Sequence, residues 1–132
     1  MRYLLDTNAC IDFLTGRFPR VGERLLSLTP ADVAVGSVVV AELRYGAEKS
    51  ARSSENNRRL DRFFEDMPVV DFDARAASAY GSLRLHLEQE GTPIGPNDML
   101  IAAQALAVRW VLVTDNVSEF ARVQGLTIEN WR

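Results

Sequence analysis

Short apolar runs alternate along the chain with longer segments whose apolar residues recur at helical spacing. The runs predict β-strands that are buried on both faces, because such strands read as continuous apolar segments. We place these strands at residues 2–5, 32–35, 69–70, 110–114 and 126–128.

The segments between the strands predict helices bounded by capping or helix-breaking residues. Thr7-Asn8 is expected to cap the first helix, which Gly16 ends, and Ser37 is expected to cap a later one. The helices are expected at residues 7–14, 19–28, 38–49, 54–65, 73–90, 98–108 and 117–122. Strands separated by helices predict an α/β domain, in which a central, mainly parallel β-sheet carries helices on both faces.

Length and composition predict a single domain over residues 1–132. The chain has 132 residues, of which 47% are hydrophobic and 25% charged, so it can bury a core without cross-links. Cys10 is the only cysteine, which excludes an internal disulfide and argues against a zinc site. No apolar segment is long enough for a signal peptide or a membrane span, and we expect a cytoplasmic protein.

The formal net charge of −3 does not exclude RNA as a partner. Lys49 is the only lysine among 15 basic residues, and arginine suits bidentate contacts with phosphate. If four carboxylates belong to a metal site, the rest of the surface is close to neutral. The overall charge therefore leaves the class of partner open.

Two aspartates directly follow predicted strands. Asp6 follows residues 2–5, and Asp115 follows residues 110–114. The carboxyl ends of parallel strands meet at one edge of a sheet, which is where ligands bind in open α/β folds. The alternative interpretation is that each aspartate only caps the helix that follows it.

Glu42 interrupts an apolar stripe on the predicted helix at residues 38–49. Val38, Val39, Tyr45 and Gly46 stand three or four positions away and are expected on the same side of the helix. A carboxylate in such a stripe is costly to bury unless it is paired or binds a metal. The alternative is a salt bridge to one of the arginines.

Asp98 begins the predicted helix at residues 98–108, which is apolar on most sides. A helix of this kind is buried, so its first turn faces a neighbouring element or a site. The alternative is that Asp98 only interacts favourably with the helix dipole.

The four acids together predict a metal site. If Asp6, Glu42, Asp98 and Asp115 converge on one edge of the sheet, they repel each other, and a bound cation removes the conflict. Oxygen ligands without thiolate or imidazole favour Mg²⁺, or Mn²⁺, and we expect Asp6 and Asp98 to bind it. Metal-bound water can act as the nucleophile while the ion polarises a phosphoryl oxygen, which indicates phosphodiester hydrolysis.

The chain resembles the VapC-type toxins, which are PIN-domain ribonucleases of type II VapBC toxin–antitoxin pairs. The resemblance covers the whole chain in the same order and rests on five blocks. These are LLDTN at 4–8, VAELRYGA at 40–47, PIGPNDMLIAA at 93–103, LVTDNVSEF at 112–120 and GLTIENW at 125–131.

This resemblance implies a PIN fold and Mg²⁺- or Mn²⁺-dependent endoribonuclease activity. It also implies a homodimer or a toxin–antitoxin hetero-oligomer. The partner is expected to be a VapB-like antitoxin, and the toxin is expected to contact DNA only indirectly, through that antitoxin. Asp6, Glu42 and Asp98 match the family's first three acids. For the fourth we favour Asp115, with Glu119 as the alternative. The NDMLIAA segment is similar to members that cut initiator tRNA, which makes that RNA a candidate substrate.

Two other functions compete with this one. A haloacid-dehalogenase-type phosphatase also begins with a strand ending in aspartate, but its second aspartate is replaced here by Asn8. A catalytically inactive PIN module would act only as an antitoxin-binding co-repressor, and the retained acids argue against it.

Overall fold

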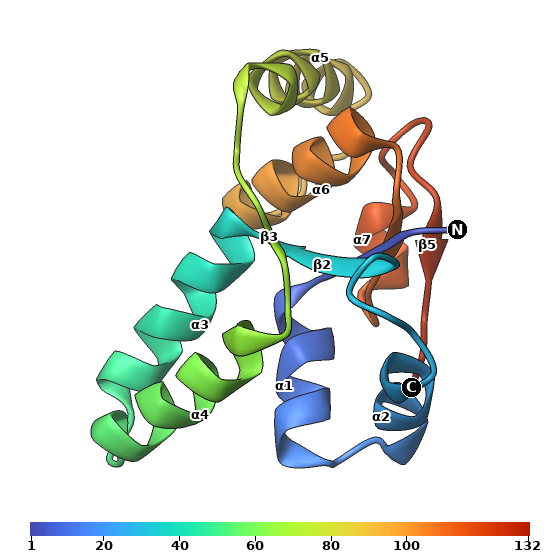
Figure 1. Ribbon diagram of the computed structural model, residues 1–132. Coiled ribbons are helices and arrows are strands. Elements are labelled where there is room, and N and C mark those ends of the chain that lie inside the picture. The colour runs from blue at the N-terminus through green and yellow to red at the C-terminus, as the bar shows by residue number, and fades with distance from the viewer.

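Five short strands form one sheet in the order β3-β2-β1-β4-β5, and every neighbouring pair is parallel (Figure 1). The computed structural model describes residues 1–132. The strands are β1 Tyr3–Leu5, β2 Val33–Gly36, β3 Val69–Val70, β4 Val111–Val113 and β5 Ile128–Glu129. The predicted α/β class is confirmed, and the sheet is parallel throughout.

Seven helices connect and cover the strands. They are α1 Thr7–Thr15, α2 Pro19–Leu26, α3 Ser37–Lys49, α4 Ser53–Glu65, α5 Ala74–Gln89, α6 Pro96–Val108 and α7 Val117–Phe120. In Figure 1, α5 and α6 lie above the sheet, α1 and α2 lie below it, and α3 and α4 extend side by side away from it. No helix combines the length and the apolar character that crossing a bilayer requires.

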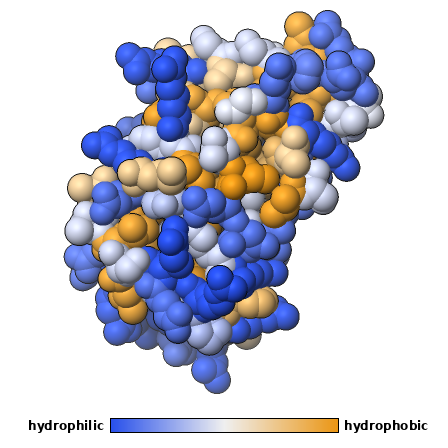
Figure 2. All heavy atoms as spheres, turned by 90° about the vertical axis from the view of Figure 1, so that its right-hand side faces the viewer, coloured by the Kyte–Doolittle hydropathy of each residue, from blue (hydrophilic) through white to orange (hydrophobic).

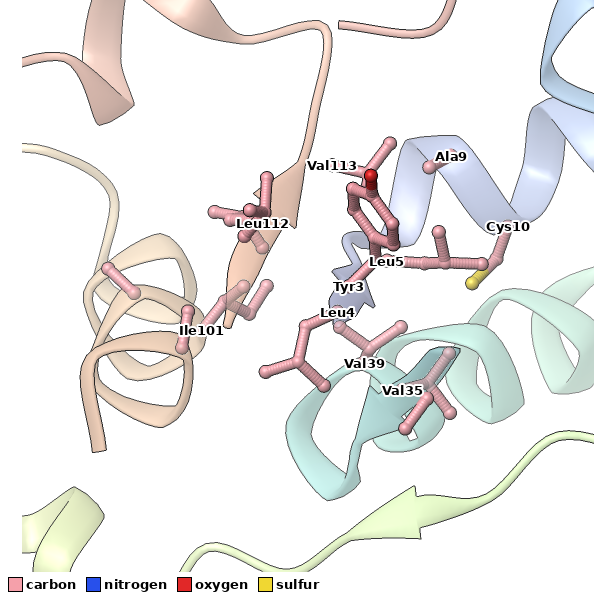
Figure 3. Close-up of a cluster of buried hydrophobic side chains, with 14 of the residues drawn as sticks. Tyr3, Leu4, Leu5, Ala9, Cys10, Val35, Val39, Ile101, Leu112 and Val113 are labelled. Atoms are coloured by element: carbon pink, nitrogen blue, oxygen red, sulfur yellow. The ribbon is translucent and has the colours of Figure 1, made fainter. Parts of the chain in front are cut away.

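The central strands bury both of their faces, which explains their continuous apolar sequence. Leu4 and Leu112 are register partners and lie with Ile101 on the side of α6, whereas Leu5 points toward Cys10 of α1 (Figure 3). All five side chains are at most 3% exposed. Burial of this apolar surface is the main favourable contribution to the folded state.

The register brings the ends of β1, β2 and β4 to the same level. Leu5 pairs with Val35 on one side and with Val113 on the other. The residues that follow these strands therefore share one edge of the sheet, and the backbone N–H of Asp6 donates to the carbonyl of Val113 at 3.0 Å.

Two predicted helix caps are wrong. Asp6, not Thr7-Asn8, is the N-cap of α1, because its carboxylate accepts from the backbone N–H of Ala9 at 2.8 Å. Ser37 does not cap α3; its hydroxyl accepts from the backbone N–H of Phe72 at 3.1 Å and so ties β2 to the segment after β3.

Several predicted boundaries also move by one or two residues. α6 begins at Pro96, with Asp98 as its third residue, because proline suits the first helical turn. The last strand is Ile128–Glu129 instead of residues 126–128.

Arginines lie over several buried or half-buried aromatic rings. The face seen in Figure 2 carries separate patches of hydrophobic side chains between hydrophilic ones. The guanidinium of Arg2 is 5.5 Å from the ring of Trp110, and that of Arg24 is 5.1 Å from the ring of Trp131. The arginines therefore partly shield aromatic surface, in addition to any role in binding anions.

The side chain of Gln104 extends from the buried face of α6 to the ends of β2 and β3. It is 2% exposed, and its side-chain amide donates to the carbonyl of Val70 at 2.9 Å. Its Oε1 has no hydrogen-bond partner and lies against Gly36, where an added Cβ would be 2.0 Å from it. Only glycine leaves room for this side chain at the end of β2.

Gly36→Ala is therefore expected to lower the free energy of unfolding by about 1–3 kcal/mol, as overpacked cores do. The backbone φ at Gly36 is −81°, so the conformation itself suits alanine and the clash alone is tested. Urea unfolding measures the effect, and Gly81→Ala, with open space around the added Cβ, is the control. Equal stability of the two variants would contradict this packing.

Candidate active site

Asp6 and Thr114 lie side by side where β1 and β4 end. Asp6 is 5% exposed, and burial raises its pKa to about 6 from 3.8. Hydrogen bonds from the Thr114 side chain and the Ala9 N–H oppose the rise, whereas the negative charges of Asp115 and Asp12 add to it. Asp6 is thus both the N-cap of α1 and a carboxyl group with a raised pKa. Its roles as a helix cap and as a site residue are therefore compatible.

Asp98, in the first turn of α6, and Glu119 of α7 are joined by a hydrogen bond between their carboxyl groups. The pKa of Asp98 is raised to about 7, first by burial and then by a hydrogen bond to Glu119 and by the charges of Glu119, Glu42 and Asp6. Glu119 keeps the charge, because hydrogen bonds from Asn116 and from protonated Asp98 lower its pKa. The two carboxyl groups therefore share one proton near neutral pH.

Glu42 reaches the same edge from α3 but is not buried in an apolar stripe. The buried residues of α3 are Val39, Leu43 and Ala47, whereas Tyr45 is 67% exposed. The Thr7 hydroxyl donates to Glu42 at 2.8 Å. Both the predicted stripe and the alternative of an arginine salt bridge are wrong, because Glu42 lies beside the buried face and pairs with a hydroxyl.

Asp115 lies beside Asp6 but is paired with the guanidinium of Arg132. Its Oδ2 is 2.9 Å from Nη1 of Arg132, and its Oδ1 accepts from the side-chain amide of Asn8 at 3.2 Å. Arg132 also binds Asp12 of α1, which is 4% exposed. Asp115, unlike Asp98, therefore has a partner for its charge.

The structure thus brings Asp6, Glu42 and the alternative acid Glu119 close enough to Asp98 for their charges to act on it, while the charge of Asp115 acts on Asp6. Asp12 and Arg132 were not predicted from the sequence. The pairing of an acid in a mostly apolar helix with an arginine 120 residues later carries no local sequence signal.

The residues fit a divalent cation. No three Asp, Glu, His or Cys side chains are already grouped closely enough to hold a metal ion between them. Magnesium does not need such a cage, because one or two carboxylates commonly hold it while water fills the other positions. Asp6 and Asp98 supply oxygen donors whose pKa values are raised by burial and by neighbouring carboxylates, so a bound cation would stabilise their charged forms.

Comparisons with known proteins agree with this architecture. A family model of the PIN domain matches residues 3–126. Ribonuclease VapC2 of Rickettsia felis is 41% identical over 99% of this chain and 98% of its own length. The tRNA(fMet)-specific endonuclease VapC of Salmonella typhimurium is 37% identical over the same shares of the two chains.

Solved structures show the same likeness. A chain in the crystal structure of VapBC2 from Rickettsia felis bound to a DNA fragment from their promoter has a TM-score of 0.93 and 40% identity, and the match covers 100% of both chains. A chain in DNA-bound VapBC from Salmonella typhimurium has a TM-score of 0.94 and 36% identity, over 100% of this chain and 99% of that one.

The family model of the PIN domain matches residues 3–126, and the parallel five-stranded sheet agrees with it, so the chain is a PIN domain. Full-length identity of 35–41% with several VapC proteins narrows the class. The chain belongs to the PIN-domain family and, within it, to the VapC ribonucleases.

Proposed function

We propose that this chain is the toxin of a toxin–antitoxin pair and cuts RNA as a magnesium-dependent endoribonuclease. One observation carries the proposal: at the edge where β1 and β4 end, burial and neighbouring carboxylates raise the pKa of both Asp6 and Asp98, and the charges of Glu119, Glu42 and Asp6 all act on Asp98. A bound cation would offset the cost of holding these charges close together. Mn²⁺ is expected to replace Mg²⁺, because it accepts the same oxygen ligands.

Each acid has a separate task in this proposal. Asp6 and Asp98 would hold the ion, which would supply activated water and polarise a phosphoryl oxygen. The Thr7 hydroxyl orients Glu42, and Asn116 orients Glu119, so both carboxylates are placed to receive protons or to hold metal-bound water. The buried Thr114 fixes Asp6, which keeps the first ligand rigid.

Asp115 and Glu119 compete for the role of fourth acid. The sequence favoured Asp115, but Glu119 is the one that contacts Asp98, and Asp115 is already paired with Arg132. We therefore propose that Glu119 acts on the metal and that Asp115 contributes to the site through its fixed position.

Initiator tRNA is the proposed substrate, since a relative at 37% identity is named a tRNA(fMet)-specific endonuclease. The test incubates the purified chain with initiator tRNA, elongator methionine tRNA and an unrelated structured RNA, each with Mg²⁺ or with EDTA. Cleavage of the initiator tRNA alone supports the full proposal. No cleavage of any RNA with Mg²⁺ would support the alternative, an inactive module that acts only as an antitoxin-binding co-repressor.

The proposed partner is a VapB-like antitoxin, through which alone the toxin would meet DNA. Related chains occur in structures of VapBC complexes, some of them bound to DNA. A groove of about 600 Å³ between α1, α2 and α4 is lined by apolar side chains that include Phe13, Leu26 and Phe63. We propose that an apolar segment of the antitoxin fills this groove. The toxin is further proposed to form a homodimer or a hetero-oligomer with the antitoxin, and both proteins are proposed to act in the cytoplasm.

Leu26→Glu is expected to weaken antitoxin binding at least about tenfold, because Leu26 is 79% exposed and would be buried in the complex. RNA cleavage by the free chain should not change, since Leu26 lies outside the acidic edge. Calorimetry with the co-expressed partner measures the effect, and Leu85→Glu on α5, 56% exposed and outside the groove, is the control. Equal affinity of the two variants would place the partner elsewhere.

A further inference from the structure

The candidate site contains one fixed guanidinium, that of Arg132. Its Nε is 2.7 Å from Oδ2 of Asp12 and its Nη2 is 3.1 Å from Oδ1 of the same residue, so the pair is bidentate. The third nitrogen, Nη1, is 2.9 Å from Oδ2 of Asp115. The guanidinium also lies 4.2 Å from the centre of the Phe18 ring. All three nitrogens and one face of this group are therefore engaged.

The anchor of the network is buried. The Asp12 side chain is 5% exposed, compared with 30% for Arg132 and 24% for Asp115. A buried carboxylate is costly unless a charged partner satisfies it, and a bidentate arginine gives the strongest geometry. Asp12 therefore fixes the direction of the guanidinium, and the guanidinium fixes the carboxylate at the end of β4.

Asp115 is held from both sides. Arg132 occupies one of its oxygens, and the side-chain amide of Asn8 occupies the other. Asp115 follows Thr114, which hydrogen-bonds Asp6, and its own charge acts on Asp6. Movement of Asp115 would therefore change the surroundings of a proposed metal ligand.

We propose that Arg132 is a positioning residue of the nuclease site: anchored by the buried Asp12, it holds the Asp115 carboxylate in place beside Asp6. The inference rests on the proposed ribonuclease function and deepens it. Its physical basis is the fork of Arg132, since one side chain must bind Asp12 through two nitrogens and Asp115 through the third. A lysine has the same charge but a single nitrogen and cannot make these contacts together.

The test compares Arg132→Gln, Arg132→Lys and Asp12→Asn, with Arg24→Gln as the matched control. Arg24 also pairs with a carboxylate, Glu129 at 3.3 Å, and lies over Trp131, but it does not touch the acids of the site. Cleavage is measured at saturating Mg²⁺, and Mn²⁺ affinity is measured by calorimetry.

Arg132→Gln is expected to lower kcat on the order of tenfold or more, as small misplacements in a site do, while Mn²⁺ affinity stays within about threefold. Arg132→Lys should not restore kcat, and Asp12→Asn should lower it in the same direction. The Asp12→Asn/Arg132→Gln double variant should be no worse than Arg132→Gln alone, because both changes disrupt one network. Arg24→Gln should match the wild type.

Three results would overturn the inference. The first is an unchanged kcat in Arg132→Gln. The second is a wild-type kcat in Arg132→Lys, which would show that the positive charge alone is needed. The third is an equal loss of kcat and of Mn²⁺ affinity in Arg132→Gln, which would indicate a general distortion of the site. If the wild-type chain cleaves no RNA, the proposed function fails and the positioning is read by NMR. The side-chain amide signals of Asn8 should then shift in Arg132→Gln and stay in place in Arg24→Gln, and an unmoved signal in Arg132→Gln would refute it.

Discussion

Replacing Asp98 with asparagine is expected to abolish Mg²⁺-dependent RNA cleavage while making the metal-free protein more stable at pH 8. The loss should reach about 100-fold or more, because a bound cation contributes several kcal/mol to such a reaction and each 1.36 kcal/mol is a factor of ten. Initial rates of RNA cleavage at saturating Mg²⁺ and urea unfolding in EDTA measure the two effects.

The gain in stability follows from the state of Asp98 in the folded protein. Its pKa is raised to about 7 by burial and by neighbouring carboxyls, so at pH 8 the folded protein holds a charge that it disfavours. Asparagine removes the charge and can still donate to Glu119, as protonated Asp98 does. At pH 4 the gain should vanish, because Asp98 is then protonated in the folded state.

Asp6 offers a matched pair of variants. Asp6→Asn should lose activity but keep the cap of α1, because an asparagine oxygen can still accept from the Ala9 N–H. Asp6→Ala should lose activity and also about 1 kcal/mol of stability from the cap. Near wild-type cleavage by Asp98→Asn or Asp6→Asn at saturating Mg²⁺ would show that the assignment of that residue is wrong.

The second large effect is a dependence of Mg²⁺ binding on pH. Protons compete with the metal for Asp98, whose pKa is about 7, and then for Asp6, whose pKa is about 6. The Mg²⁺ concentration that gives half-maximal cleavage should therefore rise as pH falls below 7, by up to about tenfold per unit for each proton displaced. Carboxylates with ordinary pKa values near 4 would show no such change between pH 6 and 8.

The stability of the metal-free protein should change in a related way. Both carboxyls have folded-state pKa values above 3.8, so the folded state binds more protons than the unfolded state between about pH 4 and 7. Their contribution to stability is present below pH 4 and is lost as pH rises through 6 and 7. Saturating Mg²⁺ at pH 8 should restore it. A half-saturating Mg²⁺ concentration that is constant from pH 6 to 8 would contradict the raised pKa values.

Much of this site could be predicted because parallel strands align their carboxyl ends. Asp6 follows an apolar run, and so does Asp115, which was enough to place both at one edge of the sheet. The apolar body of α6 likewise indicated that Asp98 faces a site. These inferences rest on patterns within a few residues of each acid.

The rest depends on contacts between distant segments. Whether Asp115 or Glu119 approaches Asp98 is decided by the turn that joins β4 to α7, where Asn116 holds Glu119. The environment of Glu42 depends on the direction in which α3 leaves the sheet. Helical spacing does not give this direction, so it predicted an apolar stripe that the structure does not have. The Asp12–Arg132 pair joins residues 120 positions apart, and no local sequence pattern predicts it.

Asp6 and Asp98 are proposed to form a divalent-cation site at the carboxyl edge of the sheet. Calorimetric titration of the purified chain with Mn²⁺ at pH 8 tests it most directly, with the Asp98→Asn variant and the Arg24→Gln variant titrated in parallel. We predict saturable binding to the wild type and to Arg24→Gln, and at least tenfold weaker binding to Asp98→Asn. Binding of equal strength to Asp98→Asn, or no binding to the wild type, would contradict the account.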